Sequence, residues 1–285
     1  MKGKCCWLVV PLPCTPGPGF EVCGRVVQSS GPLRYAIVDG LNVRDSRVHN
    51  YPPRWNAAPS QELLVIRRNH QTGQVSLDAL RWGLIPYWCK DPTGGHKPIN
   101  AKAETVARLP TFREAYRKRR CIIPVDGFFE WKAIKGQRAK QPYAIAMKDG
   151  SPFGIAGIWE NWKEPNSGEW IRTFAIITTD ANELVAEIHD RMPVILPASG
   201  YVRWLGEEED PRELMRPFPS EAMRSGLSRR ASTSQRTMIR RSLMRSCSEL
   251  IRTLFALPGS REPTSIFLRR RRTILIDKPY PKWQS

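Results

Sequence analysis

Short apolar runs separated by turn-forming residues dominate the chain between residues 23 and 224. Five of these runs are rich in Ile, Val, Phe and Thr and are bounded by Gly, Pro, Asp or Asn, which is typical of strands. They cover residues 62–68, 121–125, 142–147, 153–159 and 173–179. Many short strands with few helices, at irregular spacing, predict a largely antiparallel α+β domain and not a doubly wound sheet.

Two segments carry the capping-box spacing that begins a helix. Thr111 and Glu114 precede "FREAYRK", and Asp180 and Glu183 precede "ANELVAEIH". We expect the second helix to end in "HDRMP", where Pro193 stops it. The sequence therefore predicts two helices beside the strands.

The composition changes abruptly after Arg224. Residues 224–285 hold 15 Lys and Arg against 3 Asp and Glu, which places +12 of the net charge of +18 there, and 13 of the 15 cations are arginines. A basic nucleic-acid-binding tail is one interpretation. Another is that the segment 225–285 is translated from a shifted reading frame and is poorly ordered. The first 223 residues are only mildly basic, with 30 Lys and Arg against 24 Asp and Glu.

Residues 1–22 form a second region that differs from the domain. They combine two lysines, a short apolar run and a Pro/Gly cluster, but Pro11 and Pro13 interrupt the run that a signal peptide would need. We expect this segment to be a non-native upstream extension or a propeptide, so that the active protein begins at Cys23. Val22 would then be the true start, because GTG, a valine codon, can initiate translation in bacteria.

Cysteine usage and hydropathy narrow the class of protein further. The seven cysteines are Cys5, Cys6, Cys14, Cys23, Cys89, Cys121 and Cys247. They show neither a CxxC pair nor a cysteine/histidine ligand spacing, so a disulfide framework and a zinc site are not indicated. Nor does the chain contain an apolar run of about 18 residues. We expect an intracellular protein with no metal, no cofactor and no membrane partner.

Four segments contain residues suited to chemistry: "RWGLIPYW" (81–88), "INAKAET" (99–105), "CIIPVDGFFEWK" (121–132) and "EIHDRMP" (187–193). The third predicts a strand that continues through Gly127 to Glu130 and Trp131. Each segment also has a purely structural interpretation. His189 could complement a helix dipole, Glu130 could be a salt-bridged surface residue, and tryptophans lie more often in a core than on a binding surface.

In this order, and behind "CGR" at residues 23–25, the four segments resemble the SRAP family of SOS-response-associated peptidases, or abasic-site processing proteins. The resemblance spans about residues 22–224. It implies a single domain (23–224) with a barrel-like core and flanking helices. It also implies a monomer, located in the cytoplasm with the nucleoid, that binds single-stranded DNA containing abasic sites.

The resemblance also implies catalytic roles for Cys23, Asn100, Glu130 and His189. An N-terminal cysteine offers an amine and a thiol on one residue, and together these convert the aldehyde of an abasic sugar into a thiazolidine crosslink. Glu130 would move protons and Asn100 would hold the amine or sugar. His189 would protonate the departing sugar oxygen, because the pKa of histidine is easily tuned.

The DNA-binding residues implied in the same way are Arg25, Trp82, Trp88, Lys102, Trp131 and Arg191. Lys102 replaces the arginine usual in the family, so it keeps the charge but loses the bidentate geometry. The family's closing strand has no match after Arg224, which predicts an unpaired sheet edge.

Two other functions stay open on the sequence. A cysteine peptidase or amidohydrolase would use Cys23 as nucleophile and His189 as base. A non-catalytic nucleic-acid-binding protein would use the arginine-rich tail.

Overall fold

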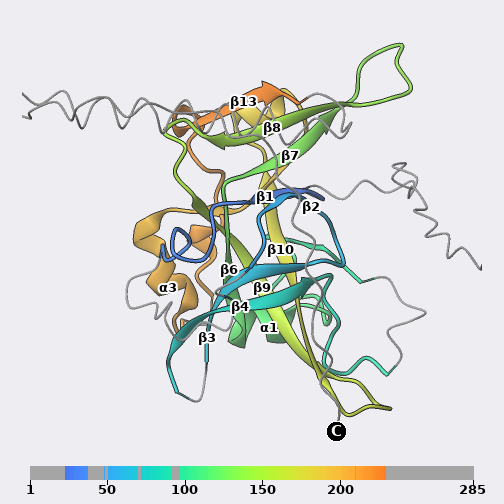
Figure 1. Cartoon of the computed structure of the whole chain (residues 1–285), viewed down its shortest axis with the longest axis vertical. Helices are drawn as coiled ribbons and strands as arrows, with labels where there is room; N and C mark the ends of the chain where they lie inside the picture. The colour runs from blue at the N-terminus through green and yellow to red at the C-terminus, as the bar shows by residue number, and fades with distance from the viewer. Residues whose placement is uncertain are drawn as a thin grey trace, which may run out of the picture. The chain divides into compact units, whose positions relative to one another are not determined.

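The computed structural model describes residues 23–37, 48, 51–69, 72–90, 97–208 and 210–228, and these form one unit (Figure 1). The first seven strands are β1 (Val26–Gln28), β2 (Arg54–Ala57), β3 (Glu62–Arg68), β4 (Val75–Trp82), β5 (Asn100–Lys102), β6 (Arg120–Val125) and β7 (Gly127–Lys132). The others are β8 (Gln141–Met147), β9 (Phe153–Lys163), β10 (Trp170–Asp180), β11 (Arg191–Pro193), β12 (Ile195–Leu196) and β13 (Met223–Leu227). The helices are α1 (Arg113–Lys118), α2 (Glu183–Ala186) and α3 (Tyr201–Leu205), with 3-10 turns at Ala198–Gly200, Arg212–Leu214 and Ser220–Ala222.

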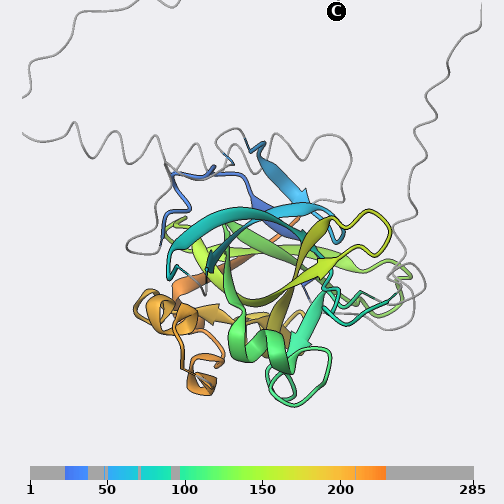
Figure 2. The same cartoon turned by 90° about the horizontal axis from the view of Figure 1, so that it is seen from below.

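Five strands close into a barrel. The pairing runs from β10 through β4, β3, β6 and β9 and returns to β10. Only the β10–β4 pair is parallel among these five contacts. Figure 2 shows the strands wrapped around a common interior. The expected α+β class, with largely antiparallel strands in a barrel-like core and flanking helices, is confirmed.

Alternation along the barrel strands builds two separate cores, because successive side chains of a strand point to opposite faces. One set points into the barrel and includes Leu63, Val65, Ile123, Phe174 and Ile176. The intervening residues point outward and are covered by α1 and α3; they include Leu64, Ile66, Ile122, Ala175 and Ile177. The barrel strands are therefore buried on both faces, which explains their continuous apolar runs.

A five-stranded sheet in the order β13-β8-β7-β1-β2 adjoins the barrel. The chain crosses from β6 in the barrel to β7 in this sheet at Asp126, so the single strand predicted through Gly127 is wrong. The carboxylate of Asp126 accepts hydrogen bonds from the Ser29 amide (2.7 Å), the Ser30 hydroxyl (2.5 Å) and the Tyr35 hydroxyl (2.6 Å). These bonds fix the crossover that brings β7 beside β1.

Both predicted helices exist, but their predicted caps are wrong. The N-cap of α1 is Phe112, which makes no side-chain capping bond. The N-cap of α2 is Asn182, whose Oδ1 accepts from the Val185 amide at 3.0 Å, while Asp180 still belongs to β10. Helix α2 ends at Ala186, three residues before His189, and Pro193 lies in β11, so Pro193 does not stop this helix.

β13 extends to Leu227, beyond the boundary expected at Arg224. It pairs with β8 over five residues, from Met223 opposite Met147 to Leu227 opposite Tyr143. Met223 is fully buried in the interior core. The strand thus covers one edge of β8.

Candidate functional site

Cys23 and Glu130 meet in the five-stranded sheet. β1 and β7 are antiparallel with Val26 opposite Phe128, and this register carries the chain before β1 alongside Glu130. The backbone nitrogen of Cys23 donates to Oε1 of Glu130 at 2.8 Å. The sequence-predicted nucleophile and acid/base residue are therefore in direct contact, through the nitrogen of Cys23.

Glu130 is a buried carboxyl group, with 3% of the residue exposed. Its pKa is raised to about 8, mainly by burial, with a smaller contribution from the charge of Asp190. The Cys23 N–H and the charge of Lys140 act in the opposite direction. At neutral pH the carboxyl is thus mostly protonated and can donate a proton, as a general acid requires.

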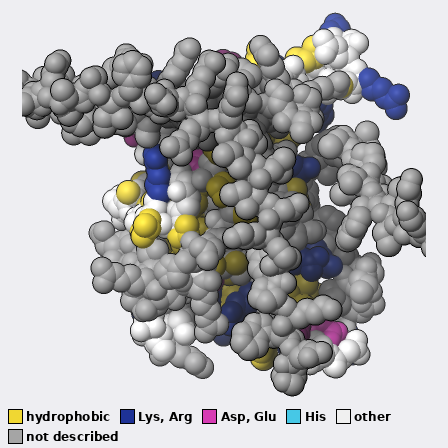
Figure 3. Space-filling model, viewed as in Figure 1, with side chains coloured by type: hydrophobic (Ala, Val, Ile, Leu, Met, Phe, Trp, Pro, Cys, Tyr) yellow, Lys and Arg dark blue, Asp and Glu magenta, His cyan; other side chains and the backbone are white. Residues whose placement is uncertain are grey.

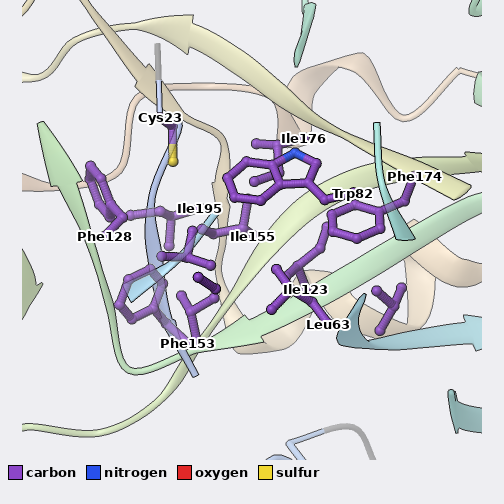
Figure 4. Close-up of a cluster of buried hydrophobic side chains, with 14 of the residues drawn as sticks. Cys23, Leu63, Trp82, Ile123, Phe128, Phe153, Ile155, Phe174, Ile176 and Ile195 are labelled. Atoms are coloured by element: carbon purple, nitrogen blue, oxygen red, sulfur yellow. The ribbon is translucent and has the colours of Figure 1, made fainter. Parts of the chain in front are cut away.

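Cys23 is buried completely and has a positive φ of 52°. Figure 4 shows its sulfur directed into the apolar cluster that contains Ile155, Ile195 and Trp82. Burial raises the pKa of the thiol well above its usual value, and the nearby Glu130 adds to this effect. The sulfur is therefore a neutral thiol here and not an activated thiolate.

His189 follows α2 and has two candidate partners at one nitrogen. Its Nδ1 lies 3.1 Å from the Arg191 amide and 2.7 Å from Oδ1 of Asp190. The amide can donate only to an unprotonated Nδ1, whereas Asp190 requires a proton there, so the two bonds belong to different protonation states. Burial lowers the pKa of His189, which favours the neutral ring. When Nδ1 of the neutral ring accepts from the Arg191 amide, Nε2 carries the proton and can donate it.

Arg191 is held by carboxylates. Its guanidinium donates to both oxygens of Glu104, at 2.8 and 3.0 Å, to Oδ1 of Asp180 at 3.1 Å, and to the Thr178 carbonyl at 2.8 Å. The bond to Arg191 lowers the pKa of Glu104. A phosphate contact by Arg191, as the sequence predicts, requires exchange with these carboxylates.

One protein-family model matches the part of the chain that contains this site. The family model described as "SOS response associated peptidase (SRAP)" matches residues 22–228. The chain belongs to the SRAP family. Its match begins one residue before Cys23 and ends just after β13, so the family domain is nearly the same part of the chain as the described unit.

Individual SRAP relatives carry names that describe an activity. Abasic site processing protein YoqW of Bacillus subtilis is 43% identical over 177 residues, which cover 61% of this chain and 77% of that protein. Abasic site processing protein YedK of Escherichia coli is 31% identical over 195 residues, covering 67% and 83%. A crystal structure of a protein from Bacteroides thetaiotaomicron matches with a TM-score of 0.66 and 29% identity over 73% of this chain and 93% of that one.

Asn100 and Lys102 lie on β5, which pairs in parallel with the end of β10. Asn100 is opposite Ile176 and Lys102 is opposite Thr178, the residue whose carbonyl also holds Arg191. Asn100 is half-buried and Lys102 is exposed. β5 therefore brings the "INAKAET" motif of this SRAP domain beside the "HDRMP" motif.

The expected DNA-binding residues differ in how accessible they are. Trp82 is 1% exposed, stacks on Phe174 and donates from Nε1 to the Ile99 carbonyl at 3.0 Å, so its ring lies in the core and not on a surface where a base could stack. Trp88 is 54% exposed and Trp131 is half-buried. Arg25 is half-buried and donates to the adjacent Gly24 carbonyl at 2.9 Å.

Three residues of the site were not assigned from the sequence. Glu104 belongs to the "INAKAET" motif. Its negative charge, opposite to the positive charge of Arg191, is the sequence feature that could have indicated their ion pair. Asp190 is adjacent to His189. Lys140 carried no signal, because only the pairing of β7 with β8 brings it to a site where its charge acts on both Glu130 and His189.

Within the described ranges, no group of three or more His, Cys, Asp or Glu side chains could hold a metal ion. In the same ranges, every helix is too short or too polar to cross a membrane. Cys23, Cys89 and Cys121 are free thiols.

Proposed function

We propose that this chain processes abasic sites in single-stranded DNA by forming a covalent thiazolidine with Cys23, once Cys23 is the N-terminal residue. The contact that supports this most directly is the 2.8 Å bond between the Cys23 nitrogen and Glu130. Relatives named abasic site processing proteins, at 43% and 31% identity, support the substrate. A cytoplasmic, nucleoid-associated monomer suits this role.

The reaction needs an unprotonated amine beside a proton donor. The ring-opened abasic sugar presents an aldehyde carbon, to which the Cys23 amine adds. Loss of one water gives a Schiff base, and the thiol then adds across the C=N bond, with its proton passing to nitrogen. The product is a five-membered ring of sulfur, Cβ, Cα, nitrogen and the former aldehyde carbon.

Glu130 can serve the amine and the leaving oxygen in turn. An N-terminal ammonium at the Cys23 position would lower the pKa of the buried Glu130, and Glu130 would raise that of the amine, so the pair shares one proton. The proton that leaves the amine then becomes available to the hydroxyl that departs as water. His189, neutral with Nε2–H, would protonate the ring oxygen of the sugar when the ring opens.

The decisive experiment is a denaturing gel with a single-stranded oligonucleotide that contains a natural abasic site. Protein that begins at Cys23 is expected to form a heat-resistant adduct with this strand, less adduct with the same site in a duplex, and none with an intact strand. Cys23→Ala should form no adduct. An adduct of equal yield with Cys23→Ala would overturn the assignment, and turnover of a peptide substrate without an adduct would favour a peptidase.

Cleavage of the peptide bond before Cys23 is a second candidate function. The amide nitrogen of Cys23 already donates to the protonated Glu130 carboxyl, and the residue has a positive φ. The thiol could attack the preceding carbonyl, forming a thioester while the nitrogen takes a proton and leaves as an amine. Water would then hydrolyse the thioester. Intact mass spectrometry of the whole chain tests this: loss of residues 1–22 that Cys23→Ala prevents is expected.

A further inference from the structure

The hairpin between β7 and β8 carries positive charge and no negative charge. Residues 132–140, "KAIKGQRAK", contain Lys132, Lys135, Arg138 and Lys140 and neither Asp nor Glu. The turn closes with a bond from the Gln137 amide to the Ile134 carbonyl at 3.0 Å. Figure 1 shows this hairpin projecting beyond the neighbouring strands, and Figure 3 shows Lys and Arg side chains gathered at its end.

The charges of the hairpin differ from those of several arginines of the domain, which are paired with carboxylates. Arg67 binds Asp78, Arg119 binds Glu160, and Arg191 binds Glu104. Within the part of the chain that the structure describes, no ion pair joins Lys132, Lys135 or Arg138 to a carboxylate. Lys135 and Arg138 are exposed. Their charge is therefore available to an anionic partner.

The hairpin begins at the site itself. β7 contains Glu130, and Lys132 follows it two residues later on the same face of the strand. On β8, Gln141 is opposite Lys132, so Lys140 lies one residue beyond that pair. The tip at Gly136 is six residues from Glu130, no more than about 22 Å along the chain. The charge of Lys140 also lowers the pKa values of Glu130 and His189, which is consistent with its position beside both.

We propose that residues 132–140 form a basic arm that binds the phosphates of single-stranded DNA next to the abasic site. The proposal rests on the proposed function, since it assumes that the lesion lies at Cys23 and Glu130. A strand that leaves the site along this hairpin meets Lys132 and Lys140 first, and then Lys135 and Arg138 at the tip. Trp131, half-buried at the base of the arm, offers an aromatic surface, and aromatic and basic side chains together are typical of single-strand binding sites.

The test measures equilibrium binding of a fluorescent single-stranded oligonucleotide with a tetrahydrofuran abasic analogue. This analogue has no aldehyde, so no crosslink forms and binding is measured alone. The variant is Lys135→Gln with Arg138→Gln, which removes the two charges at the tip and keeps Lys132 and Lys140 near the site. The control is Arg113→Gln with Lys148→Gln, which removes the same two charges from α1 and from the opposite end of β8.

The tip variant is expected to bind about fivefold more weakly at low salt. The slope of log K against log salt should fall by about 1.4, because each phosphate contact with single strands contributes about 0.7. The control should retain the wild-type affinity and slope. Equal affinity and slope in the tip variant and the control would overturn the arm. Failure of the wild type to crosslink a natural abasic strand would instead refute the proposed function, and the binding assay does not depend on that result.

Discussion

At the scale of single residues, the site depends on a carboxyl group that burial keeps protonated. Glu130 has a folded pKa of about 8 against an ordinary value of 4.5. Between these two values Glu130 holds a proton in the folded chain that it has released in the unfolded chain, so the contribution of Glu130 to stability falls as pH rises from about 4.5 towards 8. The same proton is the one that the proposed chemistry transfers.

Glu130→Gln should separate these two consequences. Glutamine has no titrating proton, so we expect the free energy of unfolding of the wild type, measured relative to this variant, to fall between pH 5 and 8. Crosslinking by protein that begins at Cys23 should slow by about 100-fold or more, as for loss of a general acid. Denaturant unfolding of the whole chain at pH 5 and pH 8, with a time course of adduct formation, measures both. A stability difference between wild type and variant that did not fall over this range would contradict the buried, protonated carboxyl.

At the scale of elements, the sequence predicted the strands better than the connections between them. The five apolar runs form β3, β6, β8, β9 and β10. Four of them, all but β8, belong to the barrel, and their burial on both faces leaves a strong local signal. The break at Asp126 was missed, since the run from Cys121 to Trp131 looks continuous and only contacts with Ser29, Ser30 and Tyr35 mark the crossover.

Sequence motifs likewise predicted a set of candidate site residues, but not how they contact one another. The Cys23–Glu130 contact joins residues that are 107 apart and depends on the β1–β7 register. The resemblance to the SRAP family implied that Trp82 contacts DNA, which needs an accessible ring. Burial of a tryptophan in the barrel depends on closure by β10, which no local pattern shows.

The Glu104–Arg191 pair connects two elements of the site, the segment after β5 and β11. Arg191 also donates its amide to His189, so the pair fixes the backbone that orients the imidazole. Glu104→Gln should therefore slow crosslinking at saturating DNA about fivefold, corresponding to ~1 kcal/mol for a half-exposed ion pair, and should alter its pH profile. Asp180→Asn is the matched control, because Asp180 is 80% exposed and makes a single contact of 3.1 Å with Arg191.

Rates at saturating and limiting DNA distinguish two roles of this pair. A slower rate at saturation supports orientation of His189. Tighter DNA binding by Glu104→Gln with an unchanged rate at saturation would contradict that role, and would show that Glu104 instead restrains Arg191 from binding phosphate.

At the scale of the whole molecule, the last described strand connects the domain boundary to the site. Met223 of β13 is buried in the interior core, and Asn182, which caps α2, directs its Nδ2 towards the Met223 sulfur at 3.4 Å and donates to the Phe218 carbonyl at 2.6 Å. Helix α2 leads directly to His189. β13 therefore supports the segment that carries His189 as well as the edge of β8.

Two truncations test where the functional domain ends. A protein of residues 23–228 should unfold cooperatively and crosslink abasic DNA as fast as one of residues 23–285, since the family match ends at residue 228.

A protein of residues 23–222 loses β13. Burial of Met223 alone contributes about 1.5–3 kcal/mol, and the exposed edge of β8 also favours aggregation. We expect a thermal midpoint lower by at least 5 °C and slower crosslinking, because the cap of α2 is loosened. Thermal unfolding followed by circular dichroism, with adduct formation measured at a temperature where both proteins are folded, checks this. A protein of residues 23–228 that failed to fold would place an essential part of the domain after residue 228, and equal midpoints for the two truncations would show that β13 does not support the barrel.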